Sequence, residues 1–350
     1  MSRFRVILTS LAASSLALTA CTAGAGGSSG GGDGGGGGGD EPITLRYAFF
    51  APEESFPGQQ MVKWAEELEQ RTDGQVEVEL FPGGTLLGAG DIYDGVSSGT
   101  VDVGLDLPSY DVGRFPVSSV ISVPIGMENS QTASRVFLDL LTELEPEEFA
   151  DYEIITAFTT EAGYLQTKER VASLDDLGGK SIRVPGSMNS LIQEMGATPV
   201  ALPTSEVSEA LATNVVEGYV TSRDQLEDLG MAEHIRYITD YPMGIAAGFV
   251  AVMDKDRFAE LPEDVQEVIR DLRPEMSEWT ATYHDEENIE SSLAYALAEG
   301  VETVEVTDPE GWESAMESEA DRWVAGHADA GFDPAAVLAK MRELAGETAE

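Results

Sequence analysis

The chain has 350 residues, of which 42% are hydrophobic, so it is long enough to bury one large core or two compact ones. It carries 64 acidic against 20 basic residues, a net charge of −44, which argues against nucleic acid as a partner because phosphate binding requires a basic surface. The acidic residues are spread along the chain, and this pattern is typical of a solvated surface adapted to high salt rather than of a binding site.

The N-terminal segment predicts export. Arg3 and Arg5 precede an apolar stretch, residues 6–18, that is too short to span a bilayer. The stretch ends in Leu-Thr-Ala-Cys, which resembles a bacterial lipobox, so we expect residues 1–20 to be a lipoprotein signal peptide and Cys21 to be acylated. The alternative is an ordinary secretory signal with a chance cysteine. Because Cys21 is the only cysteine, disulfides and thiol catalysis are excluded.

Residues 21–42 are rich in glycine and serine and predict a flexible tether above a membrane surface. Hydrophobic periodicity then predicts alternating strands and helices. In the first half we expect strands at residues 43–50, 76–80, 101–105, 154–158 and 163–167, and helices at 59–70, 91–98 and 130–144. In the second half we expect strands at 181–184, 199–202, 215–220, 249–253 and 301–306, helices after Ser187 and from Thr204, a long helical region over 261–299, and C-terminal helices.

Two segments repeat one pattern of helix end, tight turn and strand. They are residues 94–109 and 209–222, in which Asp102 and Glu217 occupy similar places. The repeat predicts two similar α/β halves whose strand ends face each other across a cleft, unless it is a coincidence of a common turn. Strands that cross between the halves more than once would form a hinge.

The strand Ser181–Val184 carries one candidate binding residue, Arg183. Its guanidinium lies on the opposite face from the β-branched Ile182 and Val184. Ligands of open α/β sheets bind at strand ends, and an arginine fork suits a carboxylate. The alternative is an arginine on a solvated edge strand.

No catalytic motif accompanies this strand. Residues 179–181 resemble the end of a P-loop, but Leu174 stands where the earlier glycine is needed, and the segment precedes a strand. The histidines, His234, His284 and His327, are far apart and fit surface or structural roles better than ligation. We therefore expect no enzyme activity, no cofactor and no metal site.

Five segments in order resemble the extracytoplasmic solute-binding proteins of tripartite ATP-independent periplasmic (TRAP) transporters, the DctP family. They are FPGGTLLG at 81–88, SSGTVDVGL at 97–105, DLGGKSIRVPG at 176–186, residues 196–218, and LPEDVQ at 261–266. The resemblance implies an α/β, two-domain, periplasmic-binding-protein-like (type II-like) fold with hinge strands and a long domain-spanning helix. It further implies one ligand in the interdomain cleft and delivery to a membrane permease driven by an ion gradient.

On this basis we expect domain I to comprise residues 43–163 plus about 248–288, and domain II residues 164–247 plus about 289–350. The protein is expected to be an extracytoplasmic monomer, anchored to the membrane through Cys21. Its partners would be a small organic acid and the TRAP permease subunits.

The resemblance also implies the binding residues. Arg183 would clamp the ligand carboxylate, and a monocarboxylate with an aromatic or aliphatic body would fit an apolar pocket. Gly163 stands where sialic-acid-binding members carry a second arginine, which argues against sialic acid. Arg223 or Lys168 could supply a second positive charge, or be surface residues. The further expected contacts are Thr221, Ser222, Phe50, Asp106, Leu107, Thr204 and Tyr164.

Three other functions remain open at this point. One is a ligand-binding sensor or adaptor lipoprotein, which adjacent permease genes would argue against. Another is a binding protein for a zwitterionic or sulfonate solute. The third is a secreted hydrolase, which would turn its ligand over.

Overall fold

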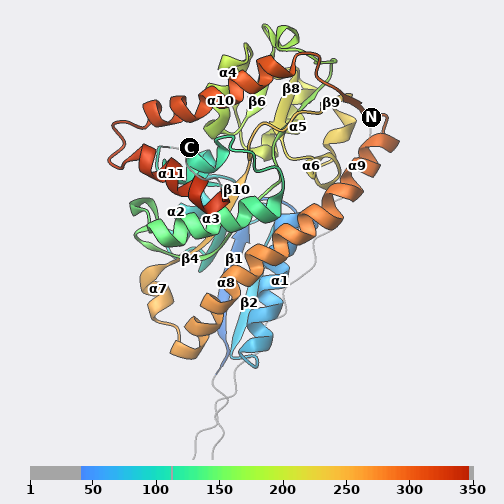
Figure 1. The fold of residues 1–350 in the computed structure, drawn as a ribbon. Coiled ribbons are helices and arrows are strands. Elements are labelled where there is room, and N and C mark those ends of the chain that lie inside the picture. Colours follow the sequence, from blue (N-terminus) through green and yellow to red (C-terminus); the bar gives the residue numbers. More distant parts are fainter. Residues whose placement is uncertain (1–40, 112, 347–350) are drawn as a thin grey trace, which may run out of the picture. The chain divides into compact units, whose positions relative to one another are not determined.

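The computed structural model describes residues 41–111 and 113–346. The predicted signal peptide, residues 1–20, the lipidation site Cys21, and the tether as far as residue 40 lie outside the described residues. Within the described part, two β-sheets are flanked by helices, as Figure 1 shows. The predicted mixed α/β fold is thus confirmed.

The first sheet has five strands in the order β2-β1-β3-β10-β4. The first three in that order are parallel neighbours, whereas β10 pairs antiparallel with both β3 and β4. The strands are β1 (Ile43–Phe49), β2 (Val76–Phe81), β3 (Val103–Asp106), β4 (Tyr152–Thr159) and β10 (Gly248–Asp254). The helices of this part are α1 (Phe56–Arg71), α2 (Ile92–Ser97), α3 (Ser130–Leu144), α7 (Lys255–Ala259) and α8 (Glu263–Tyr283).

The second sheet has six strands in the order β11-β9-β5-β8-β6-β7. Its strands are β5 (Tyr164–Thr167), β6 (Ser181–Val184), β7 (Thr198–Ala201), β8 (Gly218–Thr221), β9 (Tyr237–Thr239) and β11 (Glu302–Val304). The remaining helices are α4 (Asn189–Glu194), α5 (Val207–Ala212), α6 (Gln225–Asp228), α9 (Ile289–Ala298), α10 (Pro309–Gly326) and α11 (Pro334–Ala345).

The chain passes between the sheets several times. It leaves the first sheet after β4, enters the second at β5, and returns from β9 to β10. A third connection is helical, because α8 continues through a π-helical turn, His284–Asn288, into α9. Helix α8 packs on α1 and β4, and α9 packs on α6, so this long helix runs past both sheets (Figure 1). The hinge strands and the domain-spanning helix expected from the sequence are therefore present.

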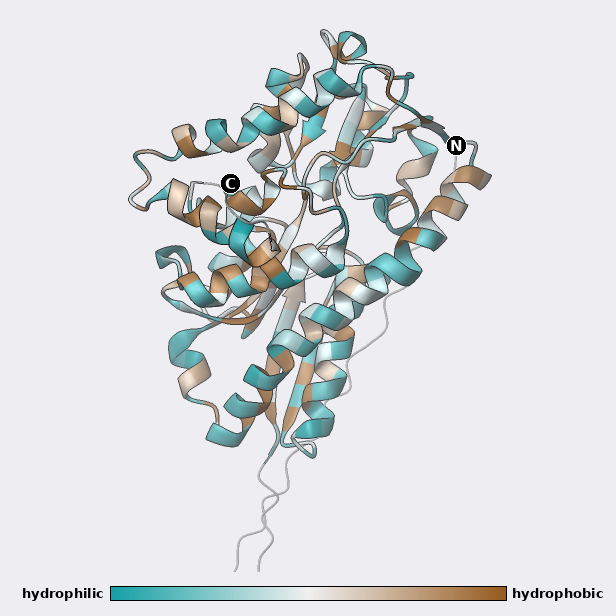
Figure 2. Ribbon diagram, in the orientation of Figure 1, coloured by the Kyte–Doolittle hydropathy of each residue, from teal (hydrophilic) through white to brown (hydrophobic). Residues whose placement is uncertain are grey.

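Local sequence explains where the elements begin and which faces they bury. Helix α1 begins where the Ser55 side chain accepts a hydrogen bond from the Gly58 backbone N–H. Its buried stripe includes Trp64, whose ring packs edge-on against Tyr47 of β1 at 5.4 Å. Figure 2 shows hydrophobic colours on the strands of the first sheet, whereas α1 and α8 alternate between hydrophobic and hydrophilic colours along their length.

The two halves share a hydrogen-bonding arrangement at Asp102 and Glu217. The Asp102 N–H donates to the Arg46 carbonyl, and the Arg46 N–H donates to Asp102 Oδ2, both at 2.9 Å. Likewise the Glu217 N–H donates to the Ser181 carbonyl at 2.9 Å, and the Ser181 N–H donates to Glu217 Oε2 at 2.7 Å. In both halves a carboxylate before a strand thus closes a ring with the neighbouring strand, which confirms that the two residues occupy equivalent places.

Three elements were not expected from the sequence, namely α6, α7 and the short strand β9. The strand expected at 215–220 begins only at Gly218, because Asn214 has a left-handed backbone (φ 57°) that ends the preceding turn. At the C-terminus, Trp312 joins the core beneath the second sheet, whereas Trp323 and α11 pack in the core with α3. The residue boundaries of the two domains stay a prediction.

Candidate functional site

Arg183 is buried, with 2% of its surface exposed. Its Nε and Nη2 atoms donate to the Leu202 carbonyl at 2.9 and 2.7 Å, and Nη2 also donates to Thr204 Oγ1 at 3.2 Å. Among the described residues, no carboxylate forms an ion pair with Arg183. Burial lowers the pKa of the guanidinium, and the nearby Tyr110 hydroxyl partly offsets this. The side chain is thus a desolvated cation without a counter-ion.

Tyr110 connects Arg183's surroundings to the first sheet. It ends a short 3₁₀ turn, Pro108–Tyr110, that follows β3, whereas Thr204 begins the 3₁₀ turn that follows β7. The Tyr110 hydroxyl donates to Thr204 Oγ1 at 3.1 Å and accepts from the Thr204 backbone N–H at 3.1 Å. The Tyr110 ring also contacts Phe50, with 5.7 Å between ring centroids. The strand ends of the two sheets therefore meet through this tyrosine.

A cavity of about 30 Å³ lies beside this contact. It is bounded by residues at or near the ends of strands of both sheets, by the segment from Asp224 to Leu229, and by the start of α1. Its lining residues are Phe49, Phe50, Ala51, Ser55, Phe56, Pro57, Leu107, Thr204, Asp224, Gln225, Asp228, Leu229, Ala247 and Phe249. This volume is about that of one water molecule in the liquid, so an organic solute fits only when the walls move apart.

Four of the residues expected in the site lie together at the cavity. Phe50, Leu107 and Thr204 line it, and Arg183 is hydrogen-bonded to Thr204 directly behind the wall. Each stands at or just after a strand end, where open α/β sheets bind ligands, and a ligand contact for each of them stays a prediction.

The other four expected residues are not among those that line the cavity. The Asp106 carboxylate accepts from the Gly90 and Leu107 N–H groups, and burial raises its pKa to about 7. Thr221 pairs with Tyr164 in the second sheet, and Ser222 Oγ lies 3.1 Å from His284 Nε2. Ligand contacts for Asp106, Thr221, Tyr164 and Ser222 stay a prediction.

The two cations considered as additional ligand contacts have protein partners. Arg223 Nε and Nη2 donate to the two Glu161 carboxylate oxygens at 2.8 and 2.6 Å, and its guanidinium lies 3.9 Å above the Tyr164 ring. The Lys168 ammonium donates to Asn214 Oδ1 at 2.7 Å.

Gly163 lies in a tightly packed place. A Cβ atom at this position would lie 3.0 Å from Ala246 Cβ and 3.0 Å from Val220 Cγ1. An arginine at this position, as in sialic-acid-binding members, would therefore require these two neighbours to shift.

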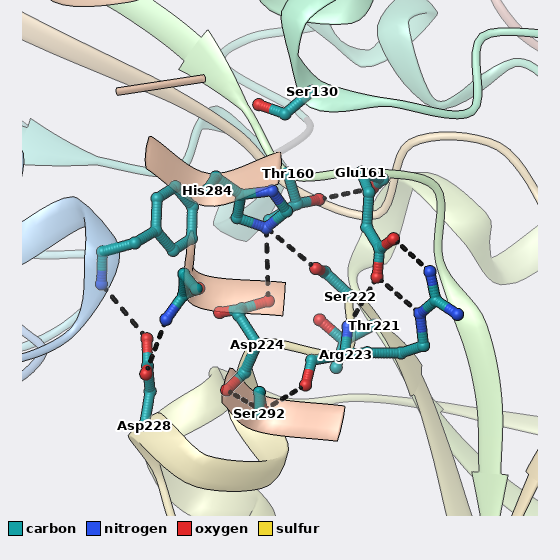
Figure 3. Close-up of polar contacts among 12 residues, drawn as sticks. Ser130, Thr160, Glu161, Thr221, Ser222, Arg223, Asp224, Asp228, His284 and Ser292 are labelled. Carbon is teal, nitrogen blue, oxygen red and sulfur yellow. Dashed lines mark hydrogen bonds and ion pairs between the residues drawn. The ribbon is translucent and has the colours of Figure 1, made fainter. Parts of the chain in front are cut away.

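Sequence reasoning missed a buried polar cluster where the chain crosses between the sheets (Figure 3). His284 is fully buried, with Nδ1 3.2 Å from Asp285 Oδ1 and Nε2 3.7 Å from Asp224 Oδ1. Burial by itself would lower the pKa of His284, but the neighbouring carboxylates of Asp224 and Asp285 raise it to about 9. Asp285 in turn accepts from the first two N–H groups of α3, Ser130 and Gln131. The cluster thus joins the start of α3, the π-helical turn and the segment before α6.

Asp228 extends this cluster to the cavity. Its carboxylate accepts from the Phe56 N–H at 3.1 Å and from Asn288 Nδ2 at 3.0 Å (Figure 3). Burial and the nearby Asp224 raise its pKa to about 7. The only sequence signal for the cluster was a set of polar residues within otherwise apolar helical spacing, at 224, 228, 284, 288 and 292.

The described part of the chain lacks two further classes of feature. None of its helices has the length and apolar character needed to cross a bilayer. No group of three or more histidine, cysteine, aspartate and glutamate side chains among these residues is arranged to hold a metal ion.

Comparison with known proteins gives consistent matches. The family described as bacterial extracellular solute-binding protein, family 7 (DctP), matches residues 47–325. A TRAP periplasmic solute-binding protein from Desulfovibrio salexigens has 37% sequence identity to this chain. Its crystal structure has the C-terminus of a symmetry mate in the ligand-binding site. The match covers 89% of this chain and 98% of that one, with a TM-score of 0.76.

Two more distant relatives carry named ligands. The ectoine/5-hydroxyectoine-binding periplasmic protein UehA of Ruegeria pomeroyi is 28% identical over 69% of this chain and 73% of its own length. A TRAP solute-binding protein from Rhodoferax ferrireducens, crystallised with copurified benzoate, is 23% identical with a TM-score of 0.81, and the match covers 87% of this chain and 98% of that one. The latter shows similarity of fold.

Proposed function

Since the chain belongs to the bacterial extracellular solute-binding proteins of family 7, which serve TRAP transporters, we propose that it captures a small organic acid through its carboxylate and delivers it to a TRAP permease. The observation that carries the proposal is the buried guanidinium of Arg183, which has no anionic partner among the described residues and sits behind the cavity wall. The protein binds solute and does not transform it.

The physical argument is one of charge compensation. A buried cation without a counter-ion costs several kcal/mol, and a ligand carboxylate would offset that cost while forming charge-assisted hydrogen bonds. The pair would form inside the protein, where salt screens it little. The negative surface would therefore not prevent an anion from binding once it has entered.

The shape and lining of the cavity indicate the remainder of the ligand. Phe49, Phe50, Phe56 and Phe249 supply aromatic walls, which suit a compact ring or a short aliphatic body. The relatives support this class of ligand, since the benzoate of the Rhodoferax protein is a small aromatic acid. The polypeptide C-terminus bound in the Desulfovibrio protein also ends in a carboxylate.

Binding would proceed by domain closure. The two sheets separate to admit the solute, Arg183 takes the carboxylate, and Tyr110 and the phenylalanines close over it from the first sheet. The ligand stabilises the closed form through its higher affinity for that form, and the permease would recognise closure. Acylation of Cys21 and the tether after it would keep a monomeric binding protein at the membrane surface.

Titration calorimetry with matched neutral analogues tests this proposal. Benzoate and mandelate, and the amide of each acid, are titrated into the protein, together with a thermal-shift screen of organic acids. We expect at least one acid to bind and raise the melting temperature while its amide does not, because only the carboxylate pairs with Arg183. Equal binding of an acid and its amide would contradict the proposal.

A further inference from the structure

The cavity has a second charged wall, which the carboxylate proposal leaves unexplained. Asp224 and Asp228 both line the cavity. Asp224 is 3% exposed, and its Oδ1 atom has no hydrogen-bond partner among the described residues. Its nearest cation, His284 Nε2, lies 3.7 Å away, which is beyond hydrogen-bonding distance. A buried acceptor of this kind is destabilising unless something donates to it.

The side of the cavity formed by Asp224 and Asp228 carries a surplus of negative charge. His284 is the only cation in the cluster, and it faces the carboxylates of Asp224, Asp285 and Asp228. The neighbouring Arg223 is already neutralised by Glu161. Arg183, next to Thr204, is an uncompensated positive charge, since no carboxylate of the described residues faces it. The cavity therefore lies between an unpaired positive charge and an excess of negative charge.

From this arrangement we propose that the preferred ligand is a zwitterion, whose carboxylate binds Arg183 and whose cationic nitrogen faces Asp224. The inference rests on the proposed function and specifies its ligand class. A cationic nitrogen satisfies Asp224 Oδ1 and offsets the excess negative charge in one contact. The phenylalanines that line the cavity also favour a cation over a neutral polar group. A simple monocarboxylate would satisfy only Arg183.

Matched ligand pairs test this on the wild-type protein. Phenylglycine is compared with mandelate, which replaces the ammonium by a hydroxyl, and proline with cyclopentanecarboxylate, which lacks the ring nitrogen. We expect the zwitterion of at least one pair to bind at least about tenfold more tightly by calorimetry. If mandelate binds as tightly as phenylglycine, a neutral hydroxyl donor satisfies Asp224 and a cationic nitrogen is not required.

An Asp224→Asn variant then locates the effect. It should reduce the affinity for the zwitterion by about tenfold or more and leave the affinity for the monoanionic ligand of the pair within about twofold. Glu290→Gln removes the same charge from an exposed position of α9 and should change neither affinity. Asp228→Asn provides a second variant on the same wall if Asp224→Asn does not fold.

The outcomes separate this inference from the function on which it rests. If the monoanions bind as tightly as the zwitterions or more tightly, the zwitterion is excluded and the carboxylate site stands. If the zwitterion preference survives in Asp224→Asn, or in Asp228→Asn where Asp224→Asn does not fold, the cationic end does not face this wall and the inference is overturned. If none of the acids in either class binds, including those of the organic-acid screen, the carboxylate proposal fails as well.

Discussion

The hydroxyl groups of Tyr110 and Thr204 meet at 3.1 Å, although these residues are 94 positions apart and follow strands of different sheets. Thr204 also accepts a hydrogen bond from Arg183, so the three side chains form a chain from the first sheet to the buried cation. This contact must break when the cavity opens. We therefore expect the strength of the contact to influence both entry and release of the ligand.

Removal of the Tyr110 hydroxyl should weaken binding. Tyr110→Phe keeps the ring against Phe50 and leaves the Thr204 N–H without its acceptor, at a cost of about 1–3 kcal/mol to the closed form. We expect a higher dissociation rate in stopped-flow fluorescence and a correspondingly higher Kd. Tyr241→Phe is the matched control, because the Tyr241 hydroxyl has no hydrogen bond in the described structure. Unchanged dissociation in Tyr110→Phe would show that the contact does not hold the closed state.

Substitution of Arg183 should affect binding and stability in opposite directions. Arg183→Gln is expected to weaken carboxylate binding by about 2–5 kcal/mol in calorimetry, since no other cation replaces it. The ligand-free variant should be as stable as the wild type or more stable in urea, because a buried, uncompensated charge has been removed. Arg183→Lys should bind with intermediate affinity, because an ammonium lacks the planar fork. Full affinity in Arg183→Gln would remove this residue from the site.

The sequence predicted elements well where local signals are strong. The bounds of α3 and β6 were correct because Asn129 caps the start of α3 and Pro185 follows β6 directly. Strand β9 was missed because three residues acquire strand geometry only by pairing with β5 and β11. Its existence depends on neighbours that no local pattern reveals.

The residues around the cavity likewise differ in how far the sequence predicts their positions. Arg183 and Thr204 stand at strand ends, and this rule of position can be applied to a sequence. The pairing of His284 with Asp224 could not be predicted, because it depends on a π-helical turn that places residues 60 positions apart in contact. The orientation of the Tyr164 side chain is likewise fixed by the register of β5 against β8.

The equivalent carboxylates of the two halves should make comparable contributions to stability. Asp102→Asn removes ion pairs with Arg46 and Arg257, and Glu217→Ala leaves the Ser181 N–H unpaired. We expect each to lower the free energy of unfolding by about 1–3 kcal/mol, measured in urea by circular dichroism. Glu299→Ala, at an exposed helix end, should change it by less than about 0.5 kcal/mol. An effect in only one half would mean that the shared geometry has no shared energetic role.

The buried His284 should make stability depend on pH in the neutral to alkaline range. Burial lowers its pKa, but the neighbouring carboxylates of Asp224 and Asp285 raise it overall to about 9 from the ordinary 6.5. Because the folded pKa is the higher one, the stabilisation is complete below about pH 6.5 and is lost as the pH rises through 9. His284→Gln removes this titration, so the stability advantage of the wild type should shrink by about 3 kcal/mol between pH 6 and pH 9.5. Urea unfolding at pH 6, 7.5 and 9.5 measures it, with His327→Gln as the control that removes an imidazole outside the cluster. An advantage that stays constant over this range would mean that His284 is not held as a cation in the folded protein.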